Sequence, residues 1–385
     1  MSKNAYIGID NTARDIKKIY LGINDTARKI KKAYIGIGGV ARPCFNTEPE
    51  YWGTLELNVD KCNLAATTVG NFALFGGGGA TGSVYSKSVD VFDKSATKVK
   101  TENLSLGRLG LAATTVGNLA LFAGGEYDYN DFYTSRVDVF DSSITRIKTA
   151  DLKEDRHSLA ATTVGNLALF AGGDDYAGHS DIVDIFDSSG TKVNTDKLSE
   201  ERYGLAATTV GKLALFAGGW DSGGVNENAS DIVDIFDSSA TRINTERLSA
   251  ERPKLAATTV GNLALFAGGG WSSITSNDNY FSDIVDIFDS SATRVMIIRL
   301  SEKRYNLAAT TIGEYALFGG GQTDKHGRCS NKVDVFDKYA TLIKTINLTK
   351  SRTKLAATTI GKYALFGGGT TYADGTVNTV DVFVN

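Results

Sequence analysis

LAATTVGNLALFAGG, at residues 255–269, is the clearest copy of a motif that recurs along this 385-residue chain. Its seven copies begin at Leu64, Leu111, Leu159, Leu205, Leu255, Leu307 and Leu355. The spacing is about 50 residues, which is typical of repeat architectures in which each unit buries apolar surface against its neighbours. We therefore interpret the chain as a repeat protein before assigning any site.

Each repeat has the pattern of four short β-strands, here called a to d. LAATTVG is strand a, NLALFAGG strand b, DIVDIFD strand c and TRINTERLS strand d. Gly117-Asn118 and its equivalents predict tight turns between strands a and b. The segment Asp-Ser-Ser-Ala-Thr at 237–241 predicts a turn from c to d, held by side-chain bonds to the backbone. Seven sets of four antiparallel strands predict an all-β fold, a seven-bladed β-propeller at residues 50–385.

The two ends of the repeat region are expected to pair. Counting nine residues back from the basic residue before strand a leads to Trp52 in the first repeat, and to Val or Ile in the others. Residues 51–60 are therefore predicted to form a strand d without a repeat before it. The chain stops after the seventh strand c. The first strand is thus expected to complete the last blade and close the ring, which leaves fewer open strand edges.

Residues 1–45 contain a different, shorter repeat, and residues 46–49 are expected to be a linker. Tyr6, Tyr20 and Tyr34 mark three units that each have two short apolar runs around a turn pair, which predicts successive β-hairpins. Isolated hairpins are only marginally stable in water, so we expect this segment to dock onto another surface. A plain basic tether is the other interpretation. The segment holds nine Lys or Arg and three Asp, although the whole chain has a net charge of −3.

Both regions resemble known families. The small-residue strand, the Gly-Gly pair and the Val-Asp-Val-Phe-Asp strand at residues 50–385 resemble the kelch repeat, although aliphatic residues replace the kelch aromatic of strand d. The Tyr-Ile-Gly and Ala-Arg units of residues 1–45 resemble repeats of virion and tail-associated proteins from phages and prophages of Gram-positive bacteria. This second resemblance implies a virion location, with residues 1–45 bound to virion structural proteins.

The loops between strands b and c differ from copy to copy, and they are rich in aromatic residues. They occupy residues 78–88, 126–135, 174–180, 220–230, 270–282, 322–331 and 369–379. We predict that they bind a host-surface glycan or protein, because flat rings stack on sugars and anchor protein interfaces. The other interpretation is that these loops only shield the strand ends. The candidate residues are Tyr127, Tyr129, Tyr133, Tyr176, Trp220, Trp271, Tyr280 and Tyr372.

One basic residue precedes strand a in every repeat. These residues are Lys61, Arg108, Arg156, Arg202, Arg252, Arg304 and Arg352. One hypothesis makes them an anion-binding ring, since guanidinium groups match carboxylates and phosphates. Their identical placement favours a structural role instead, in which they bond neighbouring loops or carbonyls. The Asp of each strand c is expected to pair with polar groups of adjacent strands.

Other function classes find little support in the sequence. The composition and charge do not favour nucleic-acid binding. Cys44, Cys62 and Cys329 form neither a disulfide framework nor a metal-binding spacing. The start has no signal-peptide pattern and no apolar run has membrane-spanning length, so we expect synthesis in a host cytoplasm without membrane insertion. Acidic pieces such as Asp174-Asp175 are a weak hypothesis for calcium, without the EF-hand pattern.

The sequence therefore predicts a non-enzymatic virion protein that needs no cofactor or metal. No nucleotide-binding loop or catalytic spacing is evident around the three histidines. A bacterial kelch-type module for protein–protein interaction, without a virion role, is the alternative. A homo-oligomer is compatible with both.

Overall fold

The computed structural model describes residues 5–9, 12–16, 20–23, 26–29, 34–37, 40–43, 48–80, 84–128, 132–175, 178–221, 228–272 and 279–385. These residues form β-strands, turns and loops without any helix, which confirms the predicted all-β class. It follows that the described part holds no helix of the length and apolarity that crossing a membrane requires. The chain divides into two compact units, Met1–Glu50 with Asn385, and Tyr51–Val384.

The first unit contains three separate two-stranded sheets. They are β1 (Ala5–Ile9) with β2 (Thr12–Ile16), β3 (Tyr20–Ile23) with β4 (Thr26–Lys29), and β5 (Tyr34–Ile37) with β6 (Val40–Pro43). Each pair is antiparallel, and its strands are separated by two residues, as in Ile9 paired with Thr12. The three predicted hairpins are therefore confirmed, while the turn pairs between their strands lie outside the described residues.

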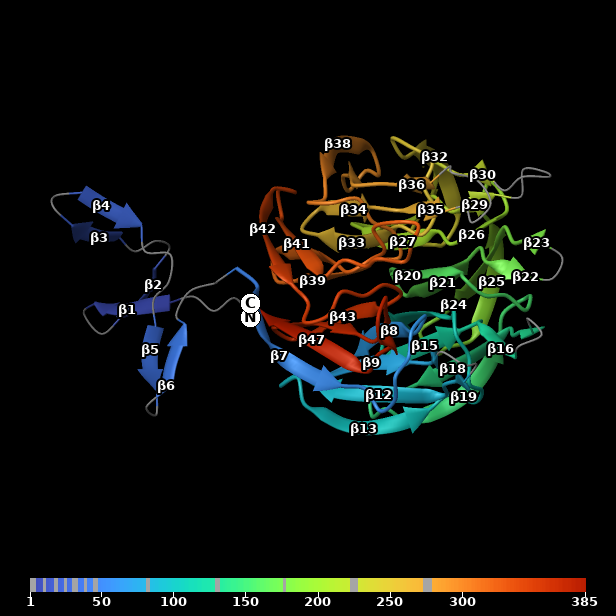
Figure 1. Ribbon diagram of the computed structural model, residues 1–385, viewed down its shortest axis with the longest axis horizontal. Coiled ribbons are helices and arrows are strands. Elements are labelled where there is room, and N and C mark those ends of the chain that lie inside the picture. The colour runs from blue at the N-terminus through green and yellow to red at the C-terminus, as the bar shows by residue number, and fades with distance from the viewer. Residues whose placement is uncertain are drawn as a thin grey trace. The chain divides into compact units, whose positions relative to one another are not determined.

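The second unit contains seven four-stranded antiparallel sheets among its described residues, each built from strands a, b, c and d in that order (Figure 1). The a strands are β8 (Ala65–Val69), β14 (Ala112–Val116), β20 (Ala160–Val164), β27 (Ala206–Val210), β33 (Ala256–Val260), β39 (Ala308–Ile312) and β43 (Ala356–Ile360). The b strands are β9 (Phe72–Gly76), β15 (Leu119–Ala123), β21 (Leu167–Ala171), β28 (Leu213–Ala217), β34 (Leu263–Ala267), β40 (Tyr315–Gly319) and β44 (Tyr363–Gly367).

The c and d strands form the outer half of each sheet. The c strands are β12 (Ser88–Asp93), β18 (Arg136–Phe140), β24 (Ile182–Phe186), β31 (Ile232–Phe236), β37 (Ile284–Phe288), β41 (Lys332–Asp337) and β47 (Thr379–Val384). The d strands are β13 (Lys98–Asn103), β19 (Arg146–Asp151), β25 (Lys192–Lys197), β32 (Arg242–Arg247), β38 (Arg294–Arg299), β42 (Leu342–Asn347) and β7 (Glu50–Glu56).

Shorter strands lie in the b–c loops. Five of these loops carry a two-stranded hairpin: β10 (Gly79–Ala80) with β11 (Val84–Tyr85), β16 (Glu126–Asp128) with β17 (Phe132–Tyr133), β22 (Asp174–Asp175) with β23 (Gly178–His179), β35 (Gly270–Ser272) with β36 (Asn279–Phe281), and β45 (Thr370–Thr371) with β46 (Gly375–Thr376). In a sixth, β29 (Trp220–Asp221) pairs with β30 (Asn228–Ala229), and β26 (Arg202–Tyr203) of the d–a connection adds a third strand to this sheet.

The seventh sheet joins the two ends of the repeat region. Its order is β43-β44-β47-β7, so the first long strand of the chain pairs with the last, and the blue ribbon of β7 lies beside the red ribbon of β47 (Figure 1). The Leu57 amide donates to the Asn378 carbonyl at 2.8 Å. The Trp52 and Tyr363 ring centroids are 5.4 Å apart, and those of Tyr51 and Phe383 are 5.9 Å apart. The expected pairing of the chain ends is confirmed, with the first strand ending at Glu56 rather than at residue 60.

The a strands meet one another in a closed cycle, and their threonines connect them. The first Thr of one copy bonds the second Thr of the next, as Thr67 Oγ1 does with Thr115 Oγ1 at 2.8 Å. The same contact joins every successive pair of copies and closes between Thr358 and Thr68, also at 2.8 Å. Short side chains allow seven strands to converge in this way, and the hydroxyls satisfy one another in the partly buried centre.

The hydrophobic core lies between neighbouring sheets. One cluster joins Val69, Leu74 and Val91 of the first sheet to Phe122 and Phe140 of the second, and all five side chains are fully buried. Strands b and c of each sheet contribute most of the larger side chains, while strand a contributes Ala, Thr and one terminal Val or Ile. The larger side chains therefore fill the space between neighbouring sheets, as close packing of a protein interior requires.

Both turn predictions are confirmed. Val116 pairs with Leu119, so Gly117 and Asn118 form the two-residue turn between strands a and b. The Asp237 carboxylate accepts hydrogen bonds from the backbone amides of Ser239 and Thr241, at 2.9 and 3.0 Å, and so holds the turn from c to d. Gly124, after strand b, has a φ of +68°, and a Cβ atom there would lie 2.6 Å from the Arg156 carbonyl oxygen. Any larger residue would push apart two neighbouring backbones.

The closed ring makes a direct prediction for Leu57, which follows β7 and is 2% exposed. Leu57→Ala is expected to lower the free energy of unfolding by about 2–5 kcal/mol, the usual range for removing a buried Leu side chain. Urea titration of Leu104→Ala gives the matched control, because Leu104 has the same 2% exposure at the equivalent place in a sheet made of continuous chain. A negligible loss for Leu57→Ala beside a large one for Leu104→Ala would mean that the chain ends do not close the ring.

Candidate functional site

The seven basic residues before the a strands are completely buried, and each forms an ion pair with the Asp of strand c in its sheet. The pairs are Lys61–Asp90, Arg108–Asp138, Arg156–Asp184, Arg202–Asp234, Arg252–Asp286, Arg304–Asp334 and Arg352–Asp381. With 0% exposure on both partners, these cations offer no surface to an external anion. The hypothesis of an anion-binding ring at these residues is therefore wrong. Their burial and their pairing with Asp agree with the structural role.

Arg304 shows how one such cation organises its surroundings. Its guanidinium donates to the Asp334 carboxylate at 2.5 Å and to the Phe318 and Gly320 carbonyls at 3.1 and 3.2 Å. Asp334 also accepts from the Ser301 amide at 3.0 Å. Because Ser301 follows strand d of the preceding sheet, the ion pair anchors the d–a connection onto the next sheet. A buried charge is tolerated only when it is paired and hydrogen-bonded in this way.

Burial of these groups affects their pKa values. Burial is the main influence on Arg304, and it lowers the pKa of the guanidinium despite the opposing attraction of Asp334. For Asp90, burial alone would raise the pKa, but Lys61 and Lys98 outweigh it and hold the pKa of the carboxyl below its usual value. The charged form of Asp90 is thus favoured in the folded protein.

Breaking one buried pair is expected to destabilise the fold strongly. Arg304→Leu leaves the Asp334 charge without its main partner, so the free energy of unfolding should fall by about 3–5 kcal/mol. Arg304→Lys should lose less, because Lys61 fills the same position in the first repeat. Chemical denaturation of both variants and of the double variant Arg304→Leu/Asp334→Leu checks this. Equal stability of wild type and Arg304→Leu would contradict the role of the pair.

The lowered pKa of Asp90 predicts a pH dependence. Its charge contributes stability above the unfolded pKa of about 3.9, and this contribution is lost as the pH falls through the lower folded value. Asp90→Asn is therefore expected to be less stable than wild type at pH 7, with a difference that shrinks below about pH 4. Urea titrations at several pH values measure this difference, and a constant difference down to pH 2 would rule out the ionised carboxylate as its cause.

Three of the predicted loop aromatics form one cluster. Trp220 and Trp271 come from neighbouring b–c loops, and their ring centroids are 5.4 Å apart. Trp271 also lies 5.0 Å from Tyr280, which is paired with it across the β35–β36 hairpin. All three side chains are half-buried. The three rings thus support one another, and part of each side chain remains accessible.

The other predicted aromatics are dispersed. Tyr133 stacks on His157 at 4.5 Å, and Tyr127 lies 6.1 Å from Phe132. Tyr372 is 68% exposed and borders a smaller hollow with Arg328 and Cys329. Tyr129 and Tyr176 lie outside the described residues. The structure therefore brings together Trp220, Trp271 and Tyr280, but it does not unite the predicted set in one site.

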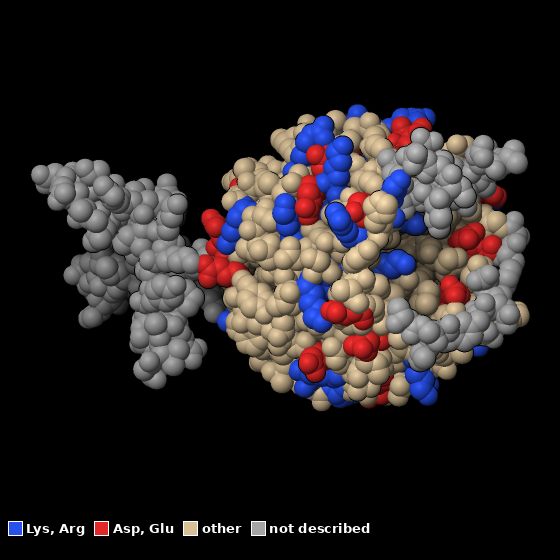
Figure 2. Space-filling view, in the orientation of Figure 1, with Lys and Arg blue, Asp and Glu red and all other residues tan. Residues whose placement is uncertain are grey.

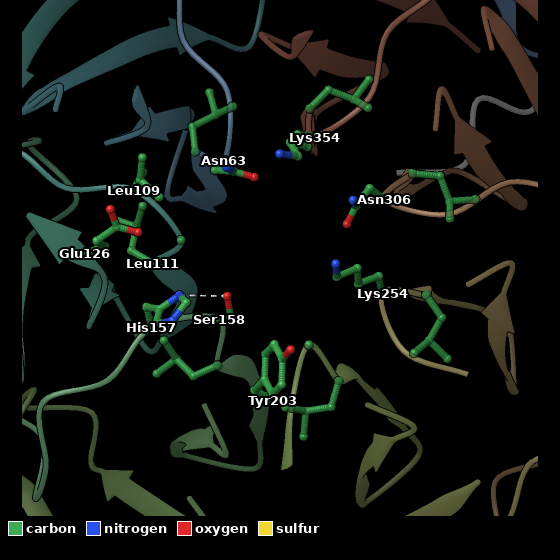
Figure 3. Close-up of a pocket in the computed structure, with 18 residues that line it drawn as sticks. Asn63, Leu109, Leu111, Glu126, His157, Ser158, Tyr203, Lys254, Asn306 and Lys354 are labelled. Atoms are coloured by element: carbon green, nitrogen blue, oxygen red, sulfur yellow. Dashed lines mark hydrogen bonds between the residues drawn. The ribbon is translucent and has the colours of Figure 1, made fainter. Parts of the chain in front are cut away.

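A cavity of about 530 Å³ opens where the d–a connections of all seven sheets converge (Figure 3). Its polar lining includes the side chains of Asn63, Ser158, Lys254, Asn306 and Lys354, and each Leu that begins an a strand also borders it. The sequence reasoning did not identify this axial pocket. Its size lies within the range of about 300–1,000 Å³ found for small-molecule sites.

The rim of the axial pocket is a closed ring of backbone hydrogen bonds. Its members stand two residues after each buried cation, and all have a φ between +51° and +66°: Asn63, Gly110, Ser158, Gly204, Lys254, Asn306 and Lys354. Each amide in this ring donates to the carbonyl of the preceding member, as Gly110 does to Asn63 at 2.9 Å, and Asn63 completes the ring by donating to Lys354 at 3.0 Å. The backbone of the rim is thus fixed, and only its side chains vary.

A signal for this pocket exists in the sequence. Between the basic residue and the Leu of strand a, every copy has two residues that differ from copy to copy, as in Arg252-Pro253-Lys254-Leu255 and Arg202-Tyr203-Gly204-Leu205. Two residues that vary between constant neighbours indicate side chains that the fold itself does not require. The sequence analysis instead considered the basic residue that recurs in every copy as a possible site.

The pocket also contains a serine beside a histidine, but the geometry does not favour acyl transfer. Ser158 Oγ lies 3.0 Å from His157 Nδ1, and His157 Nε2 lies 3.5 Å from Asp174. The amides of the rim donate to rim carbonyls, which leaves these amides unable to stabilise an oxyanion. Burial and the hydrogen bonds from His157 and His179 act in opposite directions on Asp174, and the net effect lowers the pKa of its carboxyl.

The described part of the chain shows neither a metal-binding cluster nor an activated thiol. There, no three His, Cys, Asp or Glu side chains come close enough to hold a metal ion. Cys62 and Cys329 are free thiols, and Cys44 lies outside the described residues. Burial, assisted by Asp324, raises the pKa of the Cys329 thiol to about 11, so this group stays protonated near neutral pH.

The surface charges are mixed. On the face that Figure 2 shows, acidic and basic side chains of the described residues are interspersed, without a large patch of one sign. A uniformly basic surface, as nucleic-acid binding requires, is not seen on this face.

Comparison with known proteins adds no assignment: no protein family matches the chain, and no curated protein matches its sequence.

Proposed function

We propose that this chain is a non-enzymatic, virion-associated binding protein. In this proposal, residues 50–385 form a seven-bladed, kelch-like β-propeller that binds a host-surface glycan or protein, and residues 1–45 dock it to a phage or prophage tail or baseplate. The observation that carries the binding function is the cluster of Trp220, Trp271 and Tyr280. The virion location is supported by the resemblance of residues 1–45.

The arrangement of the four strands separates two faces of the propeller. The a–b and c–d turns lie at one end of each sheet and are nearly the same in every copy, as the Asp237 turn illustrates. The b–c loops and d–a connections lie at the other end and differ from copy to copy. We call this second end the variable face. A rigid scaffold with varied loops on one face is a common design for binding proteins.

The aromatic cluster on the variable face suits a sugar ring or a protein anchor. Indole rings provide large, rigid, apolar surfaces, and they lose little conformational freedom when a ligand stacks on them. Loop segments that only shielded the strand ends would not need two tryptophans in contact across two neighbouring sheets. The glycan alternative is preferred because polar side chains of the axial pocket open on the same face.

Docking through residues 1–45 is supported by the three separate hairpins. Two-stranded sheets are marginal in water, and their edges have unpaired amide and carbonyl groups that invite pairing with another chain. The alternative is a bacterial kelch-type interaction module, which would use the same binding face but would not be part of a virion.

Glycan-array binding tests the aromatic cluster. Trp220→Ala and Trp271→Ala are each expected to reduce binding by about tenfold or more, since each removes a stacking surface at the centre of the cluster. Trp52→Ala is the matched control, because Trp52 is a half-exposed Trp at the start of strand β7, where its ring contacts Tyr363 beside the a–b turn, at the end of the sheet opposite the b–c loops. Binding that survives both loop substitutions would exclude the cluster from the site.

Particle incorporation tests the docking segment separately. The full chain is expected to copurify with phage or prophage particles, and the chain without residues 1–45 is expected to stay in the unbound fraction. Glycan binding of the truncated chain provides the folding control. Incorporation of the truncated chain, or particles that never contain the full chain, would favour the bacterial module.

A further inference from the structure

The axial pocket has a cationic side that the repeat architecture does not require. Lys254, Asn306 and Lys354 are consecutive members of the rim, joined by backbone bonds of 3.0 and 3.1 Å. Asn63 follows Lys354 and completes this arc. Figure 3 shows all four side chains reaching from one side toward the centre of the cavity. Two ammonium groups and two amides therefore face one open cavity.

Lys254 and Lys354 adopt a left-handed backbone conformation that is unfavourable for lysine, so we look for an interaction that compensates for it. Lys254 and Lys354 have φ values of +56° and +57°, a left-handed conformation that is less favourable for a residue with a side chain than for glycine. Gly110 and Gly204 occupy equivalent rim positions, so the rim accepts glycine. Such strain is commonly retained at functional sites.

The c–d turns provide a comparison within the same chain. Ala96 and Ile144 also have positive φ values, of +57° and +63°, but their side chains are buried in the core at 1% and 0% exposure. Their burial offsets the strain. Lys354 is exposed and Lys254 half-buried, so their side chains gain no comparable burial.

The opposite side of the pocket is open and partly flat. Gly110, Ser158 and Gly204 are consecutive rim members with small side chains or none, which leaves room across from the lysines. Tyr203 and His157 border this space, and the Tyr203 hydroxyl points toward the cavity in Figure 3. A flat ligand ring therefore has space, aromatic contact and polar partners on this side.

The charges around the pocket favour an anion on the lysine side. Glu126 is the acidic residue among the lining residues, and it lies across the cavity from Lys254 and Lys354, where its carboxylate accepts a hydrogen bond from Tyr85. His157 contacts Asp174 and Ser158. Lys254 also lies 5.9 Å from the Tyr305 ring, an arrangement that keeps its side chain on this side of the pocket.

From these observations we propose that the axial pocket binds the carboxylate-bearing residue of an acidic saccharide. Lys254 and Lys354 hold the carboxylate, since hydrogen bonds between an ammonium group and a carboxylate are stronger than those between neutral groups. Asn63 and Asn306 each donate and accept hydrogen bonds, which matches sugar hydroxyls. This inference rests on the proposed glycan-binding function and gives it a ligand class and a second contact point, separate from the Trp220–Trp271 cluster.

Calorimetry with a matched pair of sugars tests the pocket. Methyl glucuronide and methyl glucoside differ only in the carboxylate, and the glucuronide is expected to bind the full chain about tenfold more tightly. Lys254→Gln and Lys354→Gln should each weaken glucuronide binding by about tenfold, and leave glucoside binding nearly unchanged. Lys212→Gln is the matched control, because it removes the same charge from an exposed a–b turn on the opposite face.

Each outcome decides the proposal. Tighter glucuronide binding that depends on both lysines supports it. Equal binding of the two sugars, or glucuronide binding that survives both lysine substitutions, overturns it. If acetate or inorganic phosphate binds as tightly as the glucuronide, the site is for simple anions and the saccharide assignment is wrong. Array binding that requires Trp271 but not the lysines leaves the proposed function standing and rejects the axial pocket, whereas no glycan binding of any kind rejects both.

Discussion

Cyclic hydrogen bonding around the axis is the constraint on which the rest of this structure depends. Seven rim amides donate to seven rim carbonyls in a closed circle, and beneath them the threonines of the a strands bond from copy to copy and close between Thr358 and Thr68. A circle of this kind fixes the number of sheets, because adding or removing one would break its bonds. It also favours Ala and Thr at the first four positions of each a strand, since bulkier residues there would hold the strands apart, and a Val or Ile follows only at the fifth position.

The buried ion pairs connect the centre of the structure to the outer strands. Each cation reaches from the d–a connection into the following sheet, where the Asp of strand c also accepts the amide of a residue after the preceding strand d. Every sheet is therefore attached to its neighbour by packing and by a buried ion pair that also hydrogen-bonds the backbone. Removing one partner of such a pair leaves a buried charge and is costly. This explains why the cation, the Asp and the Leu recur in each copy while nearby residues vary.

The same constraints determine where function can reside. The a–b and c–d turns are occupied by structural bonds, and the cations are enclosed. The variable positions remain, namely the b–c loops and the two residues between each cation and its Leu. Both sets open on the variable face. An aromatic cluster at one place on this face and a cationic arc in the axial pocket give it two different chemistries, which together suit a ligand with both a flat ring and a negative charge.

The sequence alone determined the repeat, the four strands of each copy, the turns at Asp237 and Gly117-Asn118, and the pairing of Trp52's strand with the chain end, because these follow from local patterns and from counting. It also indicated Trp220, Trp271 and Tyr280 as candidates. Only the tertiary structure decided that Arg304 and its equivalents are enclosed, since burial depends on how strands distant in sequence pack. Only the closed circle brings Lys254 and Lys354, one hundred residues apart in the sequence, to one side of one pocket, and no local pattern encodes that distance.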